Sequence, residues 1–404
     1  MPPLNTPARR PPAPLAYHRE VVAHLRDTER ELWEWASSAE ARAGESEEVR
    51  TAMLKSNYRL DAAAHPDLAQ RCAAMATQLG VTAPVTMYQA QGGLGMNAAL
   101  VHLPGEAHLV FTGQILEKLV GAELDAVLAH ELAHQRLWEM DGGVFLTADR
   151  LLVSAANDPR AAASHVQTAR RFRLYTEVFA DRGALAGCGD LHAAVAALVK
   201  TETGLTTVSA EGYLRQAEEI FARGAAKTDG IEHPETFIRA RALRLWAEED
   251  ASLDEWLART IEGPLALDEL DLAGQRRAGQ LTRRFLAELL RPRWFQSAAV
   301  LAHARAFFPD FTPGLAPDES LVADLATDDK ATREYWLYLL LDFAAVDREL
   351  EDVPLAAAIV WARRFEMLEA FEKLALKELG LPKRQFTKVK KEAAELLDKA
   401  EAKP

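Results

Sequence analysis

The stretch from Val127 to His134 constrains this chain more than any other, because it contains two histidines four residues apart. On an α-helix, His130 and His134 lie one above the other on the same face. Two imidazoles placed in this way can share a tetrahedral Zn²⁺ at roughly 2.0–2.1 Å per nitrogen. Glu131 lies about 100° round the helix, near the metal but not bound to it, where a general base for a metal-bound water belongs. The alternative is a chance match to this spacing on an ordinary amphipathic helix.

A third metal ligand must come from another segment, because a catalytic zinc site takes three protein ligands and leaves the fourth position to water. The segment 161–185 is typical of one long helix, with no proline and no glycine before Gly183. On that helix Glu177 and Asp181 are four residues apart and share a face. We expect Glu177 to bind the metal and Asp181 to accept the second N–H of a ligand imidazole. A solvated pair of carboxylates is the alternative, but the apolar neighbours of this pair make a poor solvent face.

A third segment, 233–239 with the sequence HPETFIR, precedes Leu243 and completes an ordered set of motifs. HExxH, then ExxAD, then HPxxxxRxxxL resembles the order found in the gluzincin zinc metallopeptidases, in the family that contains HtpX and the CAAX prenyl proteases. The segments 97–99, 111–116 and 123–128 resemble the strand, the turn and the start of the helix that precede the HExxH motif in that family.

This resemblance covers roughly residues 50–245 and implies a zinc-dependent metalloendopeptidase that acts on a protein or peptide substrate. It implies one Zn²⁺ per chain. Thr176 departs from the family, which often has arginine directly before the ligand glutamate, and this removes the basis for a basic substrate contact there. His233 would either help to stabilise the oxyanion or close the fourth zinc position. The implied site consists of the metal ligands His130, His134 and Glu177, the catalytic residues Glu131 and His233, and the supporting residues Asp181 and Arg239.

The order of elements predicts a mainly α (α+β) fold, with a zincin-type peptidase core and a small β-sheet before the HExxH helix. Strands are expected at 85–88, 98–103 and 108–111, with a turn at Pro104-Gly105 between the last two. An exposed edge strand of such a sheet can pair with an extended substrate backbone. The residues expected to form that edge are Asn97, Ala98 and Ala99.

Composition and proline positions divide the chain into four expected parts. These are an N-terminal disordered tail and helical extension over 1–50, a zinc metallopeptidase domain over 51–250, a helical connector over 251–318 and a C-terminal helical bundle over 319–404.

Within the first half of the chain, prolines and the lack of an apolar run predict disorder over residues 1–16, with no secretory signal. One helix is expected over 17–43 and a helical pair over 51–80. Cys72 and Cys188 lack the spacing of a metal site. We expect two buried free thiols, with a disulfide as the alternative.

The segment 341–350 weakly resembles the helical bundle of tellurite-resistance B-like proteins, because Arg348 stands where that element has glycine. A generic helical bundle that binds the substrate or a protein partner is the better interpretation. The acidic residues Asp347, Glu349, Glu351 and Asp352 do not match a calcium-binding loop, and we expect them to be surface charges.

The net charge of −13 argues against a nucleic-acid partner, whose phosphates would be repelled. No apolar run of 18 residues occurs, so we expect no membrane span and a soluble, cytoplasmic protein. Two other functions compete with the peptidase. A catalytically weak zinc-binding scaffold or chaperone would not need Glu131, and a helical interaction protein without metal would bind no zinc.

Overall fold

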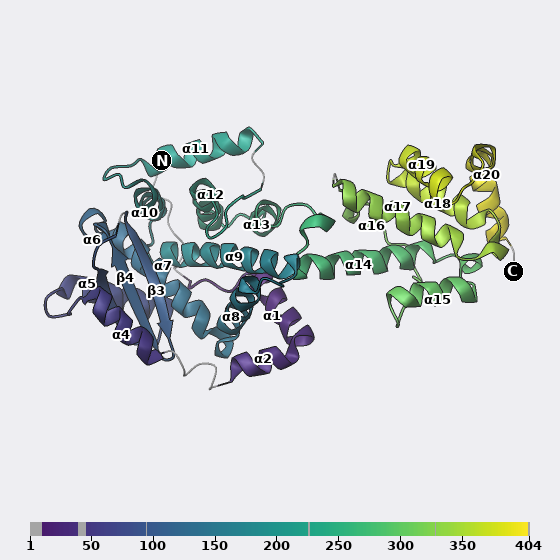
Figure 1. Cartoon of the computed structure of the whole chain (residues 1–404). Coiled ribbons are helices and arrows are strands. Elements are labelled where there is room, and N and C mark those ends of the chain that lie inside the picture. Colours follow the sequence, from purple (N-terminus) through teal and green to yellow (C-terminus); the bar gives the residue numbers. More distant parts are fainter. Residues whose placement is uncertain (1–9, 39–45, 94, 225–226, 328, 403–404) are drawn as a thin grey trace. The chain divides into compact units, whose positions relative to one another are not determined.

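The chain forms two compact units in the computed structural model (Figure 1). The first unit contains the residues up to Gly263 together with Asp271–Ala273, and the second contains Pro264–Leu270 and the residues from Gly274 onward. Each unit has its own hydrophobic core. The residues that the structure describes are 10–38, 46–93, 95–224, 227–327 and 329–402.

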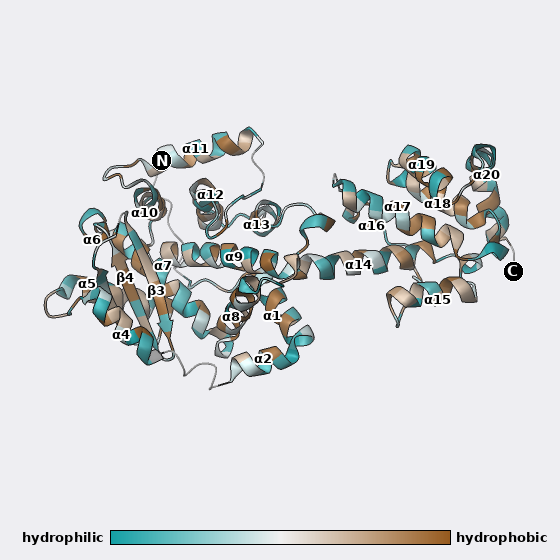
Figure 2. Ribbon diagram, viewed as in Figure 1, coloured by the Kyte–Doolittle hydropathy of each residue, from teal (hydrophilic) through white to brown (hydrophobic). Residues whose placement is uncertain are grey.

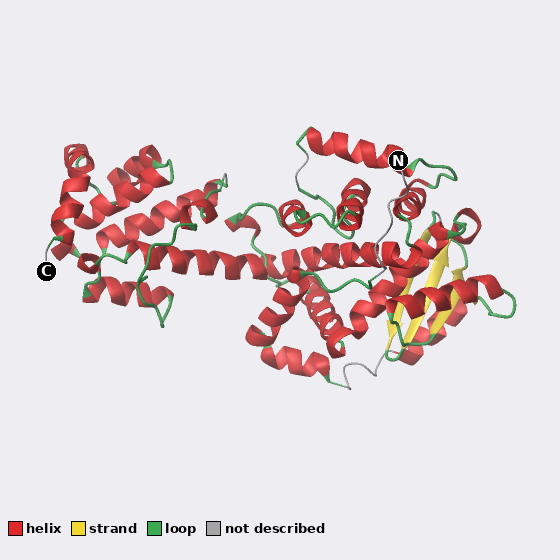
Figure 3. Cartoon of the chain, turned by 180° about the vertical axis from the view of Figure 1, so that it is seen from behind, coloured by secondary structure: helices red, strands yellow, loops and turns green. Residues whose placement is uncertain are grey.

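A four-stranded sheet precedes the HExxH helix. The sheet is yellow in Figure 3. Its strands follow the spatial order β1-β2-β4-β3, so β3 lies at an edge. β2 is parallel to β4, whereas β1 and β3 are antiparallel to their neighbours. The expected mainly α (α+β) fold with a small sheet is confirmed. The strands are β1 (Asn57–Arg59), β2 (Val85–Ala90), β3 (Asn97–Leu103) and β4 (Glu106–Thr112).

The prediction of a helical pair over 51–80 is wrong for the segment between the two helices, which contains a strand. α4 (Ser46–Ser56) and α5 (Pro66–Leu79) are separated by β1. This short strand forms because its residues pair with the end of β2, from Tyr88 to Ala90. A pairing with a partner so far along the chain leaves no local signal, since strand formation depends on cross-strand packing more than on intrinsic propensity.

The helices α7 (Ala122–Glu139) and α9 (Ala163–Cys188) pack against each other in the first unit (Figure 1). α7 carries the HExxH motif and α9 carries the ExxAD motif. A β-carbon added to Gly183 or to Gly187 of α9 would lie 2.3 Å from the β-carbon of an alanine on α7. The two backbones therefore approach each other closely, because small residues face one another at their contact.

The N-terminal region differs from expectation in two ways. The single helix expected over 17–43 is two helices, α1 (Ala16–Thr28) and α2 (Arg30–Ser37), because Glu29 leaves the helical conformation at φ −113° and ψ 43°. Residues 39–45 lie outside the described part of the chain, as do residues 1–9 of the expected disordered tail. The rest of that tail is placed, and three of its residues are buried, namely Pro12, Pro14 and Leu15.

A buried polar cluster holds the residues after α13 (Leu253–Ile261) against α1 and α9. The Tyr17 hydroxyl donates to the Asp271 carboxylate at 2.5 Å, and Arg171 lies 2.9 Å from the same carboxylate. Tyr175 donates to Glu262 at 2.7 Å, and its ring stacks on that of Tyr17. Each buried charge in this cluster therefore has a partner, as low-dielectric surroundings require.

The remaining helices of the first unit are α6 (Ile115–Lys118), α8 (Val144–Asn157), α10 (Leu191–Thr203), α11 (Ala210–Ala222) and α12 (Thr236–Ala247). Of these, α8, α10 and α12 pack against α9.

The second unit is helical, and its core contains buried aromatic side chains such as Phe285, Trp336 and Phe371. Most helices in Figure 2 show both hydrophilic and hydrophobic residues, as expected for helices with one buried face. The helices of this unit are α14 (Leu272–Leu289), which begins in the first unit, α15 (Ala298–Phe307), α16 (Leu321–Asp324), α17 (Lys330–Ala345), α18 (Val353–Arg364), α19 (Leu368–Glu378) and α20 (Lys383–Glu401).

Among the described residues, no helix combines the length and the apolar character needed to cross a bilayer. Cys72 and Cys188 are both buried and both free, so the expectation of free thiols is confirmed. Burial raises the pKa of the Cys72 thiol to about 11, which keeps it protonated and unreactive.

Candidate metal centre

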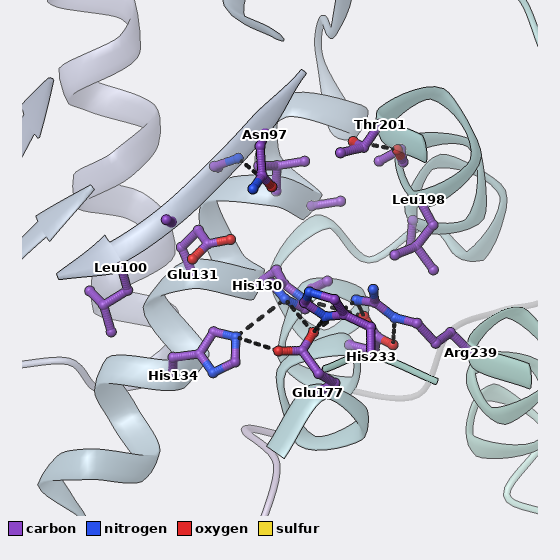
Figure 4. Close-up of a pocket in the computed structure, with 18 of the residues that line it drawn as sticks. Asn97, Leu100, His130, Glu131, His134, Glu177, Leu198, Thr201, His233 and Arg239 are labelled. Carbon is purple, nitrogen blue, oxygen red and sulfur yellow. Dashed lines mark hydrogen bonds and ion pairs between the residues drawn. The ribbon is translucent and has the colours of Figure 1, made fainter. Parts of the chain in front are cut away.

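Three side chains from α7 and α9 converge on one point (Figure 4). The Nε2 atoms of His130 and His134 lie 3.3 Å apart. The Glu177 carboxylate lies 3.5 Å from the first of these nitrogens and 3.6 Å from the second. One ligand atom from each residue falls within 4.8 Å of the others, so together they could hold a metal ion.

The chemistry of these three residues fits a divalent metal. Two imidazole nitrogens and one carboxylate oxygen form the donor set that is typical of catalytic zinc sites. The Oε2 atom of Glu177 is buried and accepts no hydrogen bond of good geometry, although Nδ1 of His233 lies 2.9 Å away. Arg239 also lies 3.4 Å from this oxygen, so Oε2 has ion-pair contacts without a well-directed bond, and a metal cation at the cluster would provide one.

The electrostatics of the ligands also favour cation binding. Burial lowers the pKa of His134 to about 4, so this imidazole is neutral and can donate its lone pair. Burial opposes ionisation of Glu177, but the nearby His130 and His233 imidazoles and the charge of Arg239 hold the pKa of this carboxyl well below its usual range. Burial also works against the charged form of His130, yet Asp181 and Glu177 raise its pKa to about 10. A metal ion must therefore displace a proton from His130.

Asp181 and Arg239 support the first ligand. The Asp181 carboxylate lies 3.1 Å from Nδ1 of His130, so it can accept the proton on Nδ1 and leave Nε2 free for a metal. The Arg239 guanidinium donates two hydrogen bonds to the same carboxylate, of 2.7 and 2.8 Å, and lies 3.4 Å from Glu177. Two parallel bonds of this kind fix the orientation of the carboxylate.

Glu131 is buried beside the cluster and does not belong to it. Burial raises the pKa of Glu131 to about 7, although the charge of His130 and a hydrogen bond from the Leu100 backbone N–H work in the opposite direction. A carboxyl group with this pKa can both accept and donate a proton near neutral pH. Because Leu100 belongs to β3, the edge strand contacts the candidate base directly.

His233 lies at the open side of the cluster, and about half of its side chain is exposed. It belongs to the loop before α12, which the Arg170 side chain holds by donating to the carbonyl oxygens of Thr228 at 2.9 Å and of Gly230 at 2.7 Å. A β-carbon on Gly230 would lie 2.0 Å from the His233 carbonyl oxygen, so only glycine fits this turn.

A cavity of about 380 Å³ opens beside the cluster. One wall is β3, where Asn97, Ala98 and Ala99 line the cavity next to Glu131. The opposite wall is α10, whose residues Ala194, Ala197, Leu198, Thr201 and the acidic Glu202 line the cavity. Figure 4 shows Leu198 and Thr201 across the cavity from Asn97.

Sequence reasoning did not identify the α10 wall. The residues that form it recur at positions 194, 197, 198, 201 and 202, which is the spacing of one helix face. That signal marks a buried face without saying whether the face covers a core or a cavity. The seven other residues expected at the site, from three separate motifs, all line this cavity: His130, Glu131, His134, Glu177, Asp181, His233 and Arg239.

Comparisons with known proteins agree with this geometry at a coarse level. Over 157 residues the chain is 29% identical to the plastoglobule-localized metallopeptidase 48, chloroplastic, of Arabidopsis thaliana. This chain is similar to a metallopeptidase. The match covers 34% of this chain and 45% of the relative, so it spans less than half of that protein. No protein-family model and no solved structure matches the chain, and the narrower assignment to the family of HtpX and the CAAX prenyl proteases stays a prediction.

Proposed function

We propose that this protein is a zinc-dependent metalloendopeptidase. The observation that carries the proposal is the convergence of His130, His134 and Glu177 within 4.8 Å at a cavity where Glu131 is buried beside them. Similarity to a metallopeptidase over part of the chain supports the same reaction class. The similarity alone does not identify the metal, and zinc is proposed because two histidines and one glutamate match its usual catalytic donor set.

Zinc held by the three ligands would lower the pKa of a coordinated water towards 7 and polarise the substrate carbonyl. Glu131 accepts the proton of the attacking water and passes it to the leaving amine, a role that suits a carboxyl with a pKa of about 7. Asp181 holds the His130 ring so that Nε2 points at the ligand cluster. Arg239 keeps Asp181 in place.

The substrate would bind as an extended strand along β3. The outer side of β3 has no strand partner in the described sheet, so its backbone groups can pair with a peptide. Asn97, Ala98 and Ala99 line the cavity at this edge, and the side chain next to the scissile bond would point towards the α10 wall. His233 lies at the mouth, where it would donate a hydrogen bond to the developing oxyanion.

Zinc content and cleavage of an unstructured protein by the purified chain test the proposal. We expect about one zinc per chain by elemental analysis. Glu131→Gln should keep the zinc and lose the cleavage, because it removes the base and leaves all three ligands. Glu177→Ala should lower the zinc content. A Glu131→Gln variant with full activity would contradict the mechanism, and a protein that binds zinc without cleaving any substrate would favour the scaffold alternative.

The four-part domain division, a cytoplasmic location and a protein partner for the second unit also remain proposals. The name of the relative places that protein at chloroplast plastoglobules and says nothing of this chain. Cell fractionation with an antibody against this protein tests the location. Comparative mass spectrometry of a host proteome treated with the wild type and with Glu131→Gln would identify the physiological substrate.

A further inference from the structure

A second cavity, of about 510 Å³, lies along the same edge strand. The two cavities share one lining residue, Trp138 of α7. Trp138 is four residues after His134 and therefore lies on the same face of the helix. Asn97 and Leu100 of β3 line the first cavity, and His102 of the same strand lines the second. A peptide extended along β3 from the candidate metal centre would pass Trp138 and reach the second cavity.

Most polar groups of the second cavity are already engaged. Nδ1 of His102 lies 2.8 Å from the Gln135 side-chain oxygen, and the Gln135 amide donates to Glu139 at 2.9 Å. The Glu139 carboxylate also accepts the backbone N–H groups of Thr82 and Ala83, both at 3.3 Å. This chain of bonds braces β3 against α7 and leaves both oxygens of Glu139 with donors.

Arg150 is the exception. Its side chain, on α8, lines the second cavity and is partly buried. It forms no hydrogen bond, and no ion pair within 4.0 Å, with any residue that the structure describes. Its charge does act on the neighbouring Asp149, where it opposes the rise in pKa that burial causes. A guanidinium offers five N–H donors and is always charged. Burial lowers the pKa of His102, so this neighbour is neutral and leaves Arg150 as the positively charged side chain among the residues that line the cavity.

We propose that the second cavity is a substrate subsite in which Arg150 binds the carboxylate of an acidic side chain. The proposal rests on the proposed peptidase function. Successive residues of an extended chain rise about 3.3 Å. His102 and Gly105 of the second cavity follow Leu100, the neighbour of Glu131, by two and five positions along the chain. The acidic residue would therefore lie about two to five residues from the scissile bond.

A peptide series tests this assignment. Each peptide is neutral and unstructured except for one glutamate, which is moved along the positions on both sides of the scissile bond, and each has a partner with glutamine in its place. We expect the zinc-loaded wild type to prefer glutamate over glutamine about fivefold in kcat/KM at one such position, the upper range for a partly exposed ion pair. Arg150→Gln should bring this ratio of kcat/KM values close to one. Arg150→Glu should prefer a peptide with lysine over one with glutamine at the same position.

The matched control is Arg160→Gln, which removes the same charge from an exposed arginine that is bonded to Asp158 and lies beyond the end of α8. This variant should keep the preference for glutamate. Cleavage of all peptides without any preference would overturn the subsite and leave the peptidase function intact. If no peptide is cleaved, the peptidase function fails first. In that case fluorescence anisotropy measures the binding of the labelled peptides to the Glu131→Gln variant. Equal Kd values for the glutamate and glutamine peptides would overturn the subsite.

Discussion

Gly183 of α9 faces Ala133 of α7 so closely that a β-carbon on Gly183 would lie 2.3 Å from the Ala133 β-carbon. Real β-carbons do not approach each other to this distance, so any larger residue at 183 must push the two helices apart. The ligands His130 and His134 are on one of these helices and Glu177 is on the other. The spacing of the helices therefore sets the size of the candidate metal site.

Gly183→Ala should destabilise the protein by about 1–3 kcal/mol through overpacking, partly offset by the better helix propensity of alanine. It should also lower zinc affinity, because a shift of the helices separates the ligands. Gly279→Ala is the matched control, since a β-carbon at this helical glycine would meet no atom within 4 Å. Urea unfolding and zinc titration measure both effects. Equal zinc affinity in Gly183→Ala and the wild type would show that the helix spacing does not control the site.

Asp181→Asn should weaken zinc binding on the order of 10–100-fold, because the proton on Nδ1 of His130 loses its charged acceptor. The change also leaves the buried Arg239 without its bidentate partner, which should lower stability. Asp254→Asn serves as the control, because this carboxylate is exposed and lies 3.5 Å from Arg182. Competition with a chelator of known affinity gives the zinc Kd. An unchanged Kd in Asp181→Asn would return Asp181 to the role of an ordinary buried carboxylate.

His233→Ala should lower kcat by about 10²-fold if His233 donates to the oxyanion, the scale expected for the loss of one such donor. If His233 instead closes the fourth metal position, the same variant should cleave an unstructured protein faster than the wild type does. We expect the first result, because it requires no regulator. His192→Ala is a suitable control, since this histidine is similarly exposed and pairs with Glu211 away from the cavity. No change in rate would remove His233 from the site.

Ala197→Phe should fill part of the cavity next to α10, because the Ala197 side chain lines the cavity wall. Peptides with a large apolar residue at the scissile bond should lose about tenfold or more in kcat/KM, whereas peptides with glycine or alanine there should be affected less. The second set of peptides controls for general damage to the enzyme, and zinc content controls for loss of the metal. A uniform loss over all peptides would argue against α10 as a specificity wall.

The buried histidine His18 should make stability depend on pH. Burial, and to a smaller degree the charge of Arg182, lowers its pKa to about 3 in the folded protein, against about 6.5 in the unfolded chain. The unfolded state therefore binds more protons between these values, and stability falls as the pH drops through this window. From pH 7 to pH 5 the loss due to His18 should be about 2 kcal/mol.

His18→Phe should remove this part of the pH dependence, because phenylalanine does not titrate and the site is already aromatic, with Phe172 and Tyr175 around the ring. Urea unfolding of the first-unit core at pH 7 and pH 5 measures the difference between the variant and the wild type. An equal change in the free energy of unfolding between pH 7 and pH 5 in both proteins would mean that His18 does not contribute to the pH dependence of stability. The comparison holds even if the variant is less stable overall, because it uses only the change in the free energy of unfolding between the two pH values.

The candidate site could be predicted largely from the sequence, because its residues occur in helices, where a spacing of four places side chains on one face. That rule applies to His130 with His134 and to Glu177 with Asp181. It does not predict that the two pairs of side chains lie next to each other in the fold. This arrangement depends on Gly183 and Gly187, whose importance is visible only once the neighbouring helix is in place.

Other features depend on partners far along the chain, and local patterns could not predict them. β1 was missed because its three residues become a strand only through pairing with β2. The break at Glu29 and the burial of Pro12 and Pro14 depend in the same way on packing within the first unit. The α10 wall shows the ordinary spacing of a helix face, and Arg150 has no local sequence signal for a binding role.

The hydrogen bond between Tyr17 and Asp271 joins residues that are 254 positions apart. α9 lies between them in the sequence, and its residue Arg171 contacts the same carboxylate. During translation, Tyr17 and Arg171 can therefore make their contacts with this carboxylate only after Asp271 has left the ribosome. A nascent chain that already contains every candidate metal ligand still lacks this closing contact, so synthesis of the ligand motifs and completion of the core around them are separated in time.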